Sequence, residues 1–173
     1  MKSIMLSIRP KWCVKIANGE KTIEVRKTRP KTDPPVKCYI YCTMGGEAIW
    51  TKNYERDGCL NGKVIGEFVC DRIDDIMISC ADPNMSGIPF PGTGLTDREI
   101  MDYIGNGKTG YGWHISDLVI YDKPKELTEF IYPPCERKSD CGSCLMFDRD
   151  NFSCKRNNFM KLPPQSWCYV EEA

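Results

Sequence analysis

The sequence GEKTIEVRK, residues 19–27, is the stretch on which the fold assignment of this chain depends. Ile23 and Val25 alternate with polar and charged residues, and a period of two with β-branched side chains is typical of a β-strand. Glu24 and Arg26 are two residues apart and therefore share one face of the predicted strand. That face either lies in water, as a surface ion pair worth ~0–1 kcal/mol, or forms the wall of a binding pocket.

The segments that flank this strand predict a mainly β domain of the α+β class with two or more short helices. Pro10 suits the first turn of a helix that ends at Asn18-Gly19, and Thr96 with Glu99 predicts the capping box of a second helix. No regular strand–helix–strand rhythm is present, so a small mixed β-barrel is favoured over a doubly wound parallel sheet. The predicted strands cover residues 1–8, 21–27, 36–44, 62–78 with a bend near Gly66, 111–124 and 162–172, and the predicted helices cover residues 10–18 and 96–104.

Length and charge set broad limits on the function. The 173 residues fit one domain over 1–173, and the formal net charge of zero gives no global sign of a nucleic-acid partner. Charge is uneven, because residues 1–31 carry nine Lys or Arg against two Glu, whereas residues 71–102 carry seven Asp or Glu against two Arg. Such a basic segment can meet a phosphate, although a solvated surface is its commoner meaning. No apolar run reaches the ~18 residues of a membrane span, which predicts a cytoplasmic protein without a membrane partner.

A family resemblance rests on four of these residues. Gly19, Lys21, Glu24 and Arg26 match the pattern Gly-x-Lys-x-x-Glu-x-Arg, and the chain therefore resembles the ASCH domain family of the PUA-like superfamily, in particular its prophage-type members. The likeness includes the segments SIRPKW, VIGEFVCDRI and GYGWHISDL and spans most of the first 130 residues plus the final strand. It implies a PUA-like mixed β-barrel with a cleft beside the first helix that binds RNA, a nucleotide or a modified nucleoside.

An enzymatic alternative follows from one branch of this family, which hydrolyses the acetyl amide of N4-acetylcytidine. In that branch the motif lysine activates a threonine three residues later; here Lys21 is present but Glu24 occupies the threonine position. The amidohydrolase mechanism therefore loses its nucleophile in this chain. A hydrolase of another modified nucleoside or a ribonuclease stays open, with Lys21 and His114 as the acid and base candidates. A third alternative is a protein-interaction adaptor without any ligand.

The candidate ligand-binding residues are cationic, acidic and aromatic. Arg26 can make a two-pronged contact with a phosphate, Lys21 adds a point charge, and Glu24 can accept from an exocyclic amine or hold Arg26 in place. Aromatic rings near the expected cleft are candidates for stacking on a base, although each is equally well a core residue. The full set is Lys21, Glu24, Arg26, Trp12, Arg9, Tyr111 and Trp113.

A cysteine-rich segment predicts a metal site. Residues 133–162 form an insert before the last strand, and it contains Cys135, Cys141, Cys144 and Cys154 in a polar stretch. The two-residue spacing between Cys141 and Cys144 lets both thiolates reach one tetrahedral ion, and the segment has little else to bury. A structural zinc ion is favoured, with an iron–sulfur cluster or simple reduced thiols as the alternatives. Strand cysteines elsewhere, such as Cys38, Cys42 and Cys70, are expected in the core.

Overall fold

The computed structural model describes most of the chain, namely residues 2–50, 58–78, 90–133, 147–148, 153–154 and 159–173. Strands dominate these residues and two α-helices accompany them, so the predicted mainly β architecture with short helices is confirmed. The grouping of all 173 residues into one domain with an insert at 133–162 stays a prediction.

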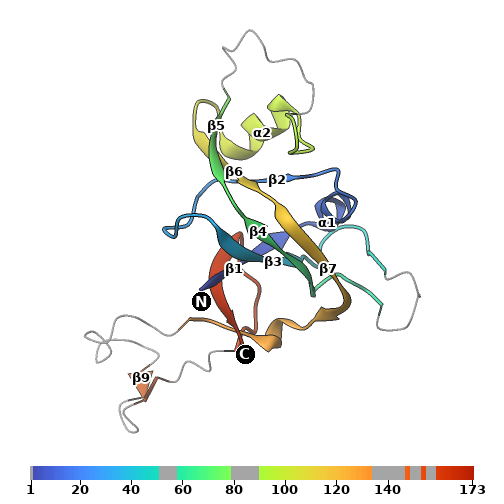
Figure 1. Cartoon of the computed structure of the whole chain (residues 1–173), viewed down its shortest axis with the longest axis vertical. Helices are drawn as coiled ribbons and strands as arrows, with labels where there is room; N and C mark the ends of the chain where they lie inside the picture. Colours follow the sequence, from blue (N-terminus) through green and yellow to red (C-terminus); the bar gives the residue numbers. More distant parts are fainter. Residues whose placement is uncertain (1, 51–57, 79–89, 134–146, 149–152, 155–158) are drawn as a thin grey trace.

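The larger of the sheets contains six strands and includes both the first and the last strand of the chain (Figure 1). Its strands are β1 (Ser3–Ile8), β3 (Val36–Cys42), β4 (Val64–Cys70), β7 (Ser116–Lys125), β8 (Phe130–Ile131) and β11 (Trp167–Glu172). Their spatial order is β7-β4-β3-β1-β11-β8. Strand β1 lies inside the sheet, where it pairs in parallel with β3 and antiparallel with β11.

A second sheet of three strands carries the GEKTIEVRK stretch. It consists of β2 (Ile23–Arg26), β5 (Ile73–Met77) and β6 (Thr109–His114), in the spatial order β2-β6-β5. The register places Glu24 opposite Trp113 and Arg26 opposite Tyr111. A short pair, β9 (Phe147–Asp148) with β10 (Ser153–Cys154), lies within the predicted insert.

Two long strands predicted from sequence are each divided in the structure. The predicted strand over 62–78 becomes β4 and β5, which belong to different sheets, and the one over 111–124 becomes β6 and β7, separated by Ile115. Just after this second break Asp117 has a φ of 47°, which is uncommon for a residue other than glycine. These breaks carry the chain from one sheet to the other. In the residues that the structure describes, the ladders end at edge strands and do not close into a hydrogen-bonded barrel.

A close backbone approach explains the predicted bend near Gly66. The β4–β7 ladder shifts register between Val64 and Gly66, and a Cβ atom at position 66 would lie 2.5 Å from the carbonyl oxygen of Val119. Only glycine lets the two backbones meet at this distance. The prediction of a bend at Gly66 is therefore confirmed as an irregularity of strand pairing.

The hydrophobic core lies on both sides of the six-stranded sheet and under the second helix. Cys38, Cys42 and Cys70 are fully buried in the core, as predicted, and they are free thiols. The largest core cluster joins β1, β3 and β4 to the inner face of the first helix through Cys13 and Ile16.

Both predicted α-helices are present, and they form walls of the site described below. Helix α1 (Pro10–Ala17) begins with a proline and ends before Gly19. Gly19 has a φ of 75°, in the left-handed region that glycine adopts without steric strain. Helix α2 (Asp97–Ile104) begins after Thr96, whose hydroxyl accepts from the backbone N–H of Glu99. The Glu99 carboxylate in turn accepts from the backbone N–H of Thr96 at 2.8 Å, so the predicted capping box is confirmed. A short 3₁₀ turn over Leu127–Glu129 precedes β8.

We expect Thr96→Ala to lower the free energy of unfolding by about 1 kcal/mol, because it leaves an N-terminal N–H group of α2 without its acceptor. Urea denaturation followed by circular dichroism measures this change. Thr96→Ser keeps the hydroxyl group and serves as the control, with stability close to that of the natural sequence. Equal stability of the alanine and serine variants would contradict the role of the cap.

Candidate functional site

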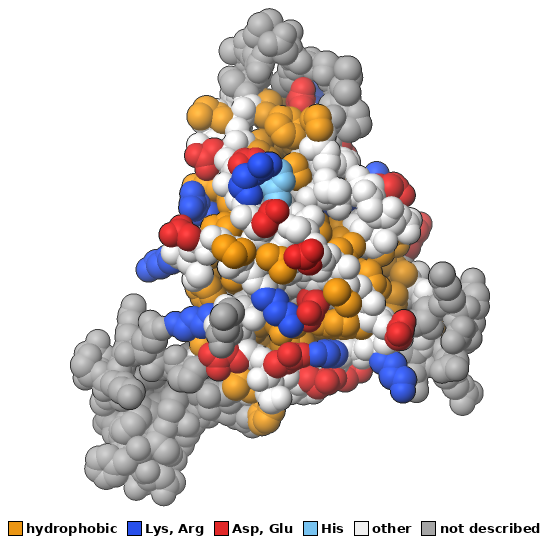
Figure 2. Space-filling view, in the orientation of Figure 1, with side chains coloured by type: hydrophobic (Ala, Val, Ile, Leu, Met, Phe, Trp, Pro, Cys, Tyr) orange, Lys and Arg blue, Asp and Glu red, His pale blue; other side chains and the backbone are white. Residues whose placement is uncertain are grey.

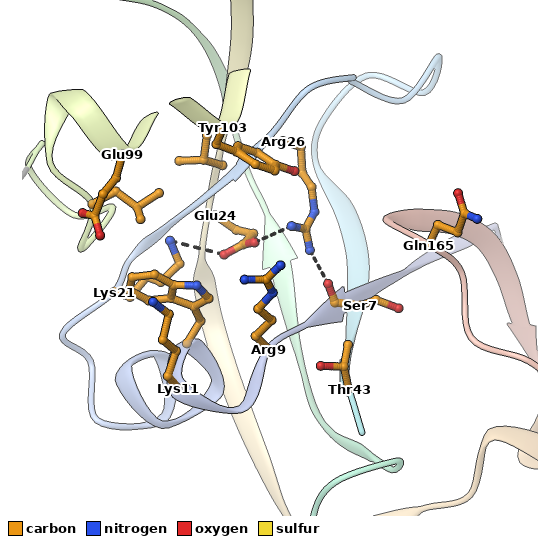
Figure 3. A pocket seen from close by; sticks show the side chains of 13 residues that line it. Ser7, Arg9, Lys11, Lys21, Glu24, Arg26, Thr43, Glu99, Tyr103 and Gln165 are labelled. Carbon is orange, nitrogen blue, oxygen red and sulfur yellow. Dashed lines mark hydrogen bonds and ion pairs between the residues drawn. The ribbon is translucent and has the colours of Figure 1, made fainter. Parts of the chain in front are cut away.

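A pocket of about 360 Å³ opens beside the first helix, where the resemblance placed a cleft (Figure 3). Its walls come from β1 and the turn into α1, from GEKTIEVRK, and from α2. A residue after β3 and one before β11 complete the rim. The lining residues are Ser7, Arg9, Lys11, Trp12, Lys21, Glu24, Val25, Arg26, Thr43, Leu95, Glu99, Tyr103 and Gln165.

The Lys21 side chain lies on the floor of this pocket because β2, in which side chains alternate between the two faces, begins only at Ile23. The backbone N–H groups of Glu20 and Lys21 both donate to the carbonyl of Lys15, which closes the end of α1, and β2 starts at Ile23. The Lys21 side chain therefore does not follow the alternation and instead joins Glu24. Its ammonium donates to the carbonyls of Ile23 at 2.7 Å and Thr93 at 2.6 Å.

Lys21, Glu24 and Arg26 form a chain of charges across the pocket floor. The Lys21 Nζ atom lies 3.2 Å from Glu24 Oε2, and the other oxygen, Oε1, lies 2.7 Å from an Arg26 nitrogen. The Arg26 guanidinium also donates to the carbonyl of Ser7 at 2.7 Å. Figure 3 shows the three contacts in one line from Lys21 to Ser7.

These charges are buried, which decides between the two interpretations of the strand. Lys21, Glu24 and Arg26 are only 2%, 4% and 7% exposed. A solvated surface ion pair is therefore the wrong interpretation, and the charged face of β2 is a wall of the pocket. Burial lowers the pKa of Lys21, and the facing Glu24 carboxylate opposes that shift by favouring the ammonium form.

Two polar atoms of this floor are not hydrogen-bonded to any described residue. They are Glu24 Oε2, which faces Lys21 without hydrogen-bond alignment, and Arg26 Nε. One is an acceptor and the other a donor, and both are shielded from water. Buried polar groups in proteins are almost always hydrogen-bonded, so a donor and an acceptor without hydrogen bonds on one floor indicate a place for a ligand or an ordered water.

The rim of the pocket is basic and aromatic. Arg9 is exposed, and Figure 3 shows its guanidinium directed toward Glu24. The Lys11 ammonium lies 4.3 Å from the centre of the half-buried Trp12 ring. Tyr103 contributes a second ring, 38% exposed. Counting all lining residues, four cations face two carboxylates, which gives the pocket a formal charge of +2.

Some lining residues were not predicted from sequence. Glu99 was recognised only as a helix cap, yet its carboxylate lies at the pocket edge; hydrogen bonds from Thr96 lower its pKa. Tyr103 follows four residues later and so lies on the same face of α2. That spacing could have indicated both. Ser7, Thr43 and Gln165 carry no sequence signal, because only the fold brings them here.

Three predicted residues do not line the pocket. Trp113 is completely buried and packs against Trp167 at 5.6 Å between ring centres, which fits the core interpretation left open for it and leaves no exposed ring face for a base. Tyr111 is half-buried against the main core cluster. His114 accompanies Asp74 and Arg72, with its Nε2 atom 2.8 Å from Asp74 Oδ2, so the fold does not place it with Lys21 in this pocket.

Charges of both signs intermingle away from the pocket. Figure 2 shows the histidine, coloured pale blue, beside basic and acidic side chains on a face where blue and red are interspersed. The uneven charge of the sequence therefore does not produce a one-signed surface on this face.

The predicted metal ligands lie mostly outside the described residues. Cys135, Cys141 and Cys144 are not described, and Cys154 is placed only as part of the backbone of β10. Within the described ranges no group of three or more His, Cys, Asp or Glu side chains could hold a metal ion. Likewise, no helix of the described part is long and apolar enough to cross a bilayer.

Comparisons with known proteins identify the fold. No family model matches the sequence, and no curated protein matches it. Solved structures do match, among them three of an ASCH protein from Zymomonas mobilis. The Zymomonas mobilis protein without a substitution gives a TM-score of 0.56 at 18% identity, and the match covers 98% of this chain and 87% of that chain. Two single-substitution variants give TM-scores of 0.58 and 0.57 at 18% and 17% identity, covering 99% and 98% of this chain and 91% and 88% of theirs.

The chain therefore has the mainly β fold of this ASCH protein, as the sequence resemblance implied. At this level of identity the likeness establishes the fold alone. The assignment to prophage-type members stays a prediction.

We expect Lys21→Met to lower the free energy of unfolding by about 3–5 kcal/mol, because it leaves a buried carboxylate without one of its two cations. Lys27→Met changes an exposed lysine of the same stretch and is the matched control, expected within about 0.5 kcal/mol of the natural sequence. Denaturant unfolding of the two variants measures the difference. If both lost the same stability, the charge chain would not support the fold.

Proposed function

We propose that this protein binds RNA, or a nucleotide or modified nucleoside, in the pocket floored by Lys21, Glu24 and Arg26. The observation that carries the proposal is the buried donor and acceptor on that floor, Arg26 Nε and Glu24 Oε2. Neither is hydrogen-bonded to a described residue, and Glu24 Oε2 has only its ion pair with Lys21 at 3.2 Å. A nucleobase edge offers an amine beside a ring nitrogen or carbonyl, which is the complementary pair.

The dimensions and the rim of the pocket support the same ligand class. A volume of about 360 Å³ lies at the lower end of the range for small-molecule sites. Trp12 and Tyr103 offer aromatic surface on which a base can stack. Arg9 and Lys11 add exposed cations for a phosphate. The ASCH fold of the Zymomonas mobilis protein is consistent with this proposal.

The contacts of Lys21 favour recognition over catalysis. The carbonyls of Ile23 and Thr93 accept from its ammonium, and the Glu24 carboxylate forms an ion pair with it at 3.2 Å. All three favour the ammonium form and oppose the burial that lowers the pKa of Lys21, whereas a general base must offer a free lone pair. Glu24, which occupies the threonine position of the amidohydrolases, is itself engaged by Lys21 and Arg26. Hydrolysis of a modified nucleoside or of RNA is therefore the less favoured alternative.

We expect the protein to bind at least one member of a panel composed of the four ribonucleosides, N4-acetylcytidine and a short single-stranded RNA of each base. Arg9→Ala should weaken the binding of the RNA members about tenfold or more, because a charge-assisted hydrogen bond to a phosphate contributes about 1.5–3 kcal/mol. Isothermal titration calorimetry measures the affinities. Arg72→Ala removes an exposed cation paired with Asp74, away from the pocket, and is the matched control.

Each other outcome of this experiment has a defined meaning. An affinity for RNA that Arg9→Ala leaves unchanged would place the RNA elsewhere. Absence of binding to every member would support the adaptor alternative. Conversion of N4-acetylcytidine or RNA during the titration, detected by mass spectrometry and lost in Lys21→Met, would support the enzyme.

We also propose that Cys135, Cys141, Cys144 and Cys154 hold a structural zinc ion. The support is the spacing of these cysteines in a polar segment and the two-residue interval between Cys141 and Cys144. The side chains involved lie outside the described residues, and the proposal rests on sequence alone.

Elemental analysis of protein purified without added metal should find about one zinc ion per chain. The double variant Cys141→Ser/Cys144→Ser should lose that zinc, because it removes half of the ligands. Cys168→Ser, at a free thiol on β11, is the control and should retain the metal. Iron in place of zinc would favour the cluster alternative, and neither metal would leave the cysteines as thiols.

A further inference from the structure

Four of the free cysteine thiols lie in the largest core cluster and form two neighbouring pairs. They are Cys13 on α1, Cys38 and Cys42 on β3, and Cys70 on β4, and none is more than 1% exposed. Cys38 and Cys42 are four residues apart, so both point to the same face of β3. Cys42 has Cys13 as its neighbour, and Cys38 has Cys70. The proposed function uses neither pair.

The contact between Cys13 and Cys42 is built around the last residue of β1. The carbonyl oxygen of Ile8 accepts from the Cys13 thiol at 3.5 Å and from the backbone N–H of Thr43 at 2.9 Å. Ile8 is also the register partner of Cys42 in the parallel ladder of β1 and β3. This one carbonyl therefore holds the Cys13 sulfur against the end of β3, within hydrogen-bonding reach of the Cys42 sulfur.

The two thiols differ in how readily they ionise. The hydrogen bond from Cys13 lowers the pKa of Cys42, although burial opposes that shift. The same contact raises the pKa of Cys13, and burial raises it further. Oxidants react with thiolates and not with thiols. Cys42 is therefore the first nucleophile of the pair, and Cys13 is the partner that reacts second.

Both sulfur atoms lie one residue behind the wall of the pocket. Trp12 precedes Cys13 and Thr43 follows Cys42, and both of these neighbours line the pocket. Helix α1 has eight residues, of which three are buried. A helix this short is not stable alone, so a brief local opening of α1 suffices to expose both thiols to a small molecule in the pocket.

We propose that Cys13 and Cys42 are a site of reversible oxidation, where hydrogen peroxide converts the two thiols into a disulfide that joins α1 to β3. The Cys42 thiolate attacks one peroxide oxygen, the O–O bond breaks, and hydroxide leaves and takes up the proton that Cys42 released. The Cys13 sulfur then attacks the sulfur of the resulting sulfenic acid. The S–S bond forms, the S–O bond breaks, and the second oxygen leaves as water with the Cys13 proton. The two sulfurs lose two electrons in total, and the peroxide gains them.

The second pair of cysteines supplies an internal control. Val36 is the register partner of Cys70, so Cys38 and Cys70 occupy diagonal positions on β3 and β4. Diagonal Cα atoms are about 7–8 Å apart, whereas a disulfide needs a separation of about 4.4–6.8 Å. Burial raises the pKa of both Cys38 and Cys70. These two thiols should therefore stay reduced.

Peptide mapping of the protein after brief treatment with hydrogen peroxide tests the proposal without any ligand. The remaining thiols are blocked with iodoacetamide in denaturant before digestion, and mass spectrometry then identifies the state of each cysteine. We expect the peptides of Cys13 and Cys42 to be joined, with the loss of two hydrogen atoms, and dithiothreitol to separate them. Cys38 and Cys70 should be recovered as alkylated thiols.

Stability provides a second measurement, because a disulfide between Cys13 and Cys42 closes a loop of about 30 residues in the unfolded chain. Peroxide should therefore raise the urea midpoint of the natural sequence, and dithiothreitol should restore it. The rise should be absent in Cys13→Ser and in Cys42→Ser. It should be kept in Cys70→Ser, which removes an equally buried thiol of the same cluster.

Three results would overturn the inference. Unmodified Cys13 and Cys42 at a peroxide concentration that oxidises the partly exposed Cys59 would show that α1 does not open. Sulfinic acid at Cys42 beside a reduced Cys13 would show that the two sulfurs cannot meet. Equal crosslinking of Cys38 to Cys70 would assign the reaction to the crowding of thiols in the core. Each of these results would leave the proposed function intact.

Discussion

The structure depends on a buried carboxylate held between two cations. Glu24 lies between Lys21 and Arg26, and each cation continues to a backbone carbonyl of another segment. Lys21 reaches Thr93 in the loop before α2, and Arg26 reaches Ser7 at the end of β1. Through its two cations, the Glu24 side chain thus fixes the relative positions of three pocket walls, namely β2, the end of β1 and the loop before α2. Taking three charges out of water is unfavourable by several kcal/mol per ion before their mutual attraction is counted, which makes this arrangement a poor choice for stability alone.

The sign of the buried charge explains why a pocket at this place suits an anionic, polar ligand. Two cations and one carboxylate leave a formal excess of one positive charge beneath a basic rim. In a region of low dielectric such an excess is weakly screened, so it acts on whatever enters the pocket more strongly than an exposed lysine would. The same burial fixes the geometry of Arg26 and Glu24, and preorganised polar groups lose little entropy when a ligand binds.

The sequence predicted local features well and long-range ones poorly. The capping box at Thr96 and the helix stop at Gly19 depend on neighbouring residues, and both are confirmed. The position of Lys21 could not be read from alternation, because the strand begins two residues later. The choice between base stacking and the core stays open for Trp113 in the sequence, because its packing partner Trp167 lies in a segment more than 50 residues away. The amino-acid composition around Trp113 does not indicate a packing partner that is so distant in the sequence.

The place of β1 inside the large sheet has a consequence for how the protein is made. One neighbour, β3, follows within about 30 residues, but the other, β11, comes at the far end of the sequence. On a ribosome, β1 would therefore keep one edge of backbone groups unpaired until nearly the whole chain had been synthesised. The Lys21–Glu24–Arg26 floor and its contact to Ser7 can form earlier, because they need only nearby segments and the loop at Thr93. The floor of the pocket would then take shape before its rim, because Gln165 directly precedes β11 and arrives with it.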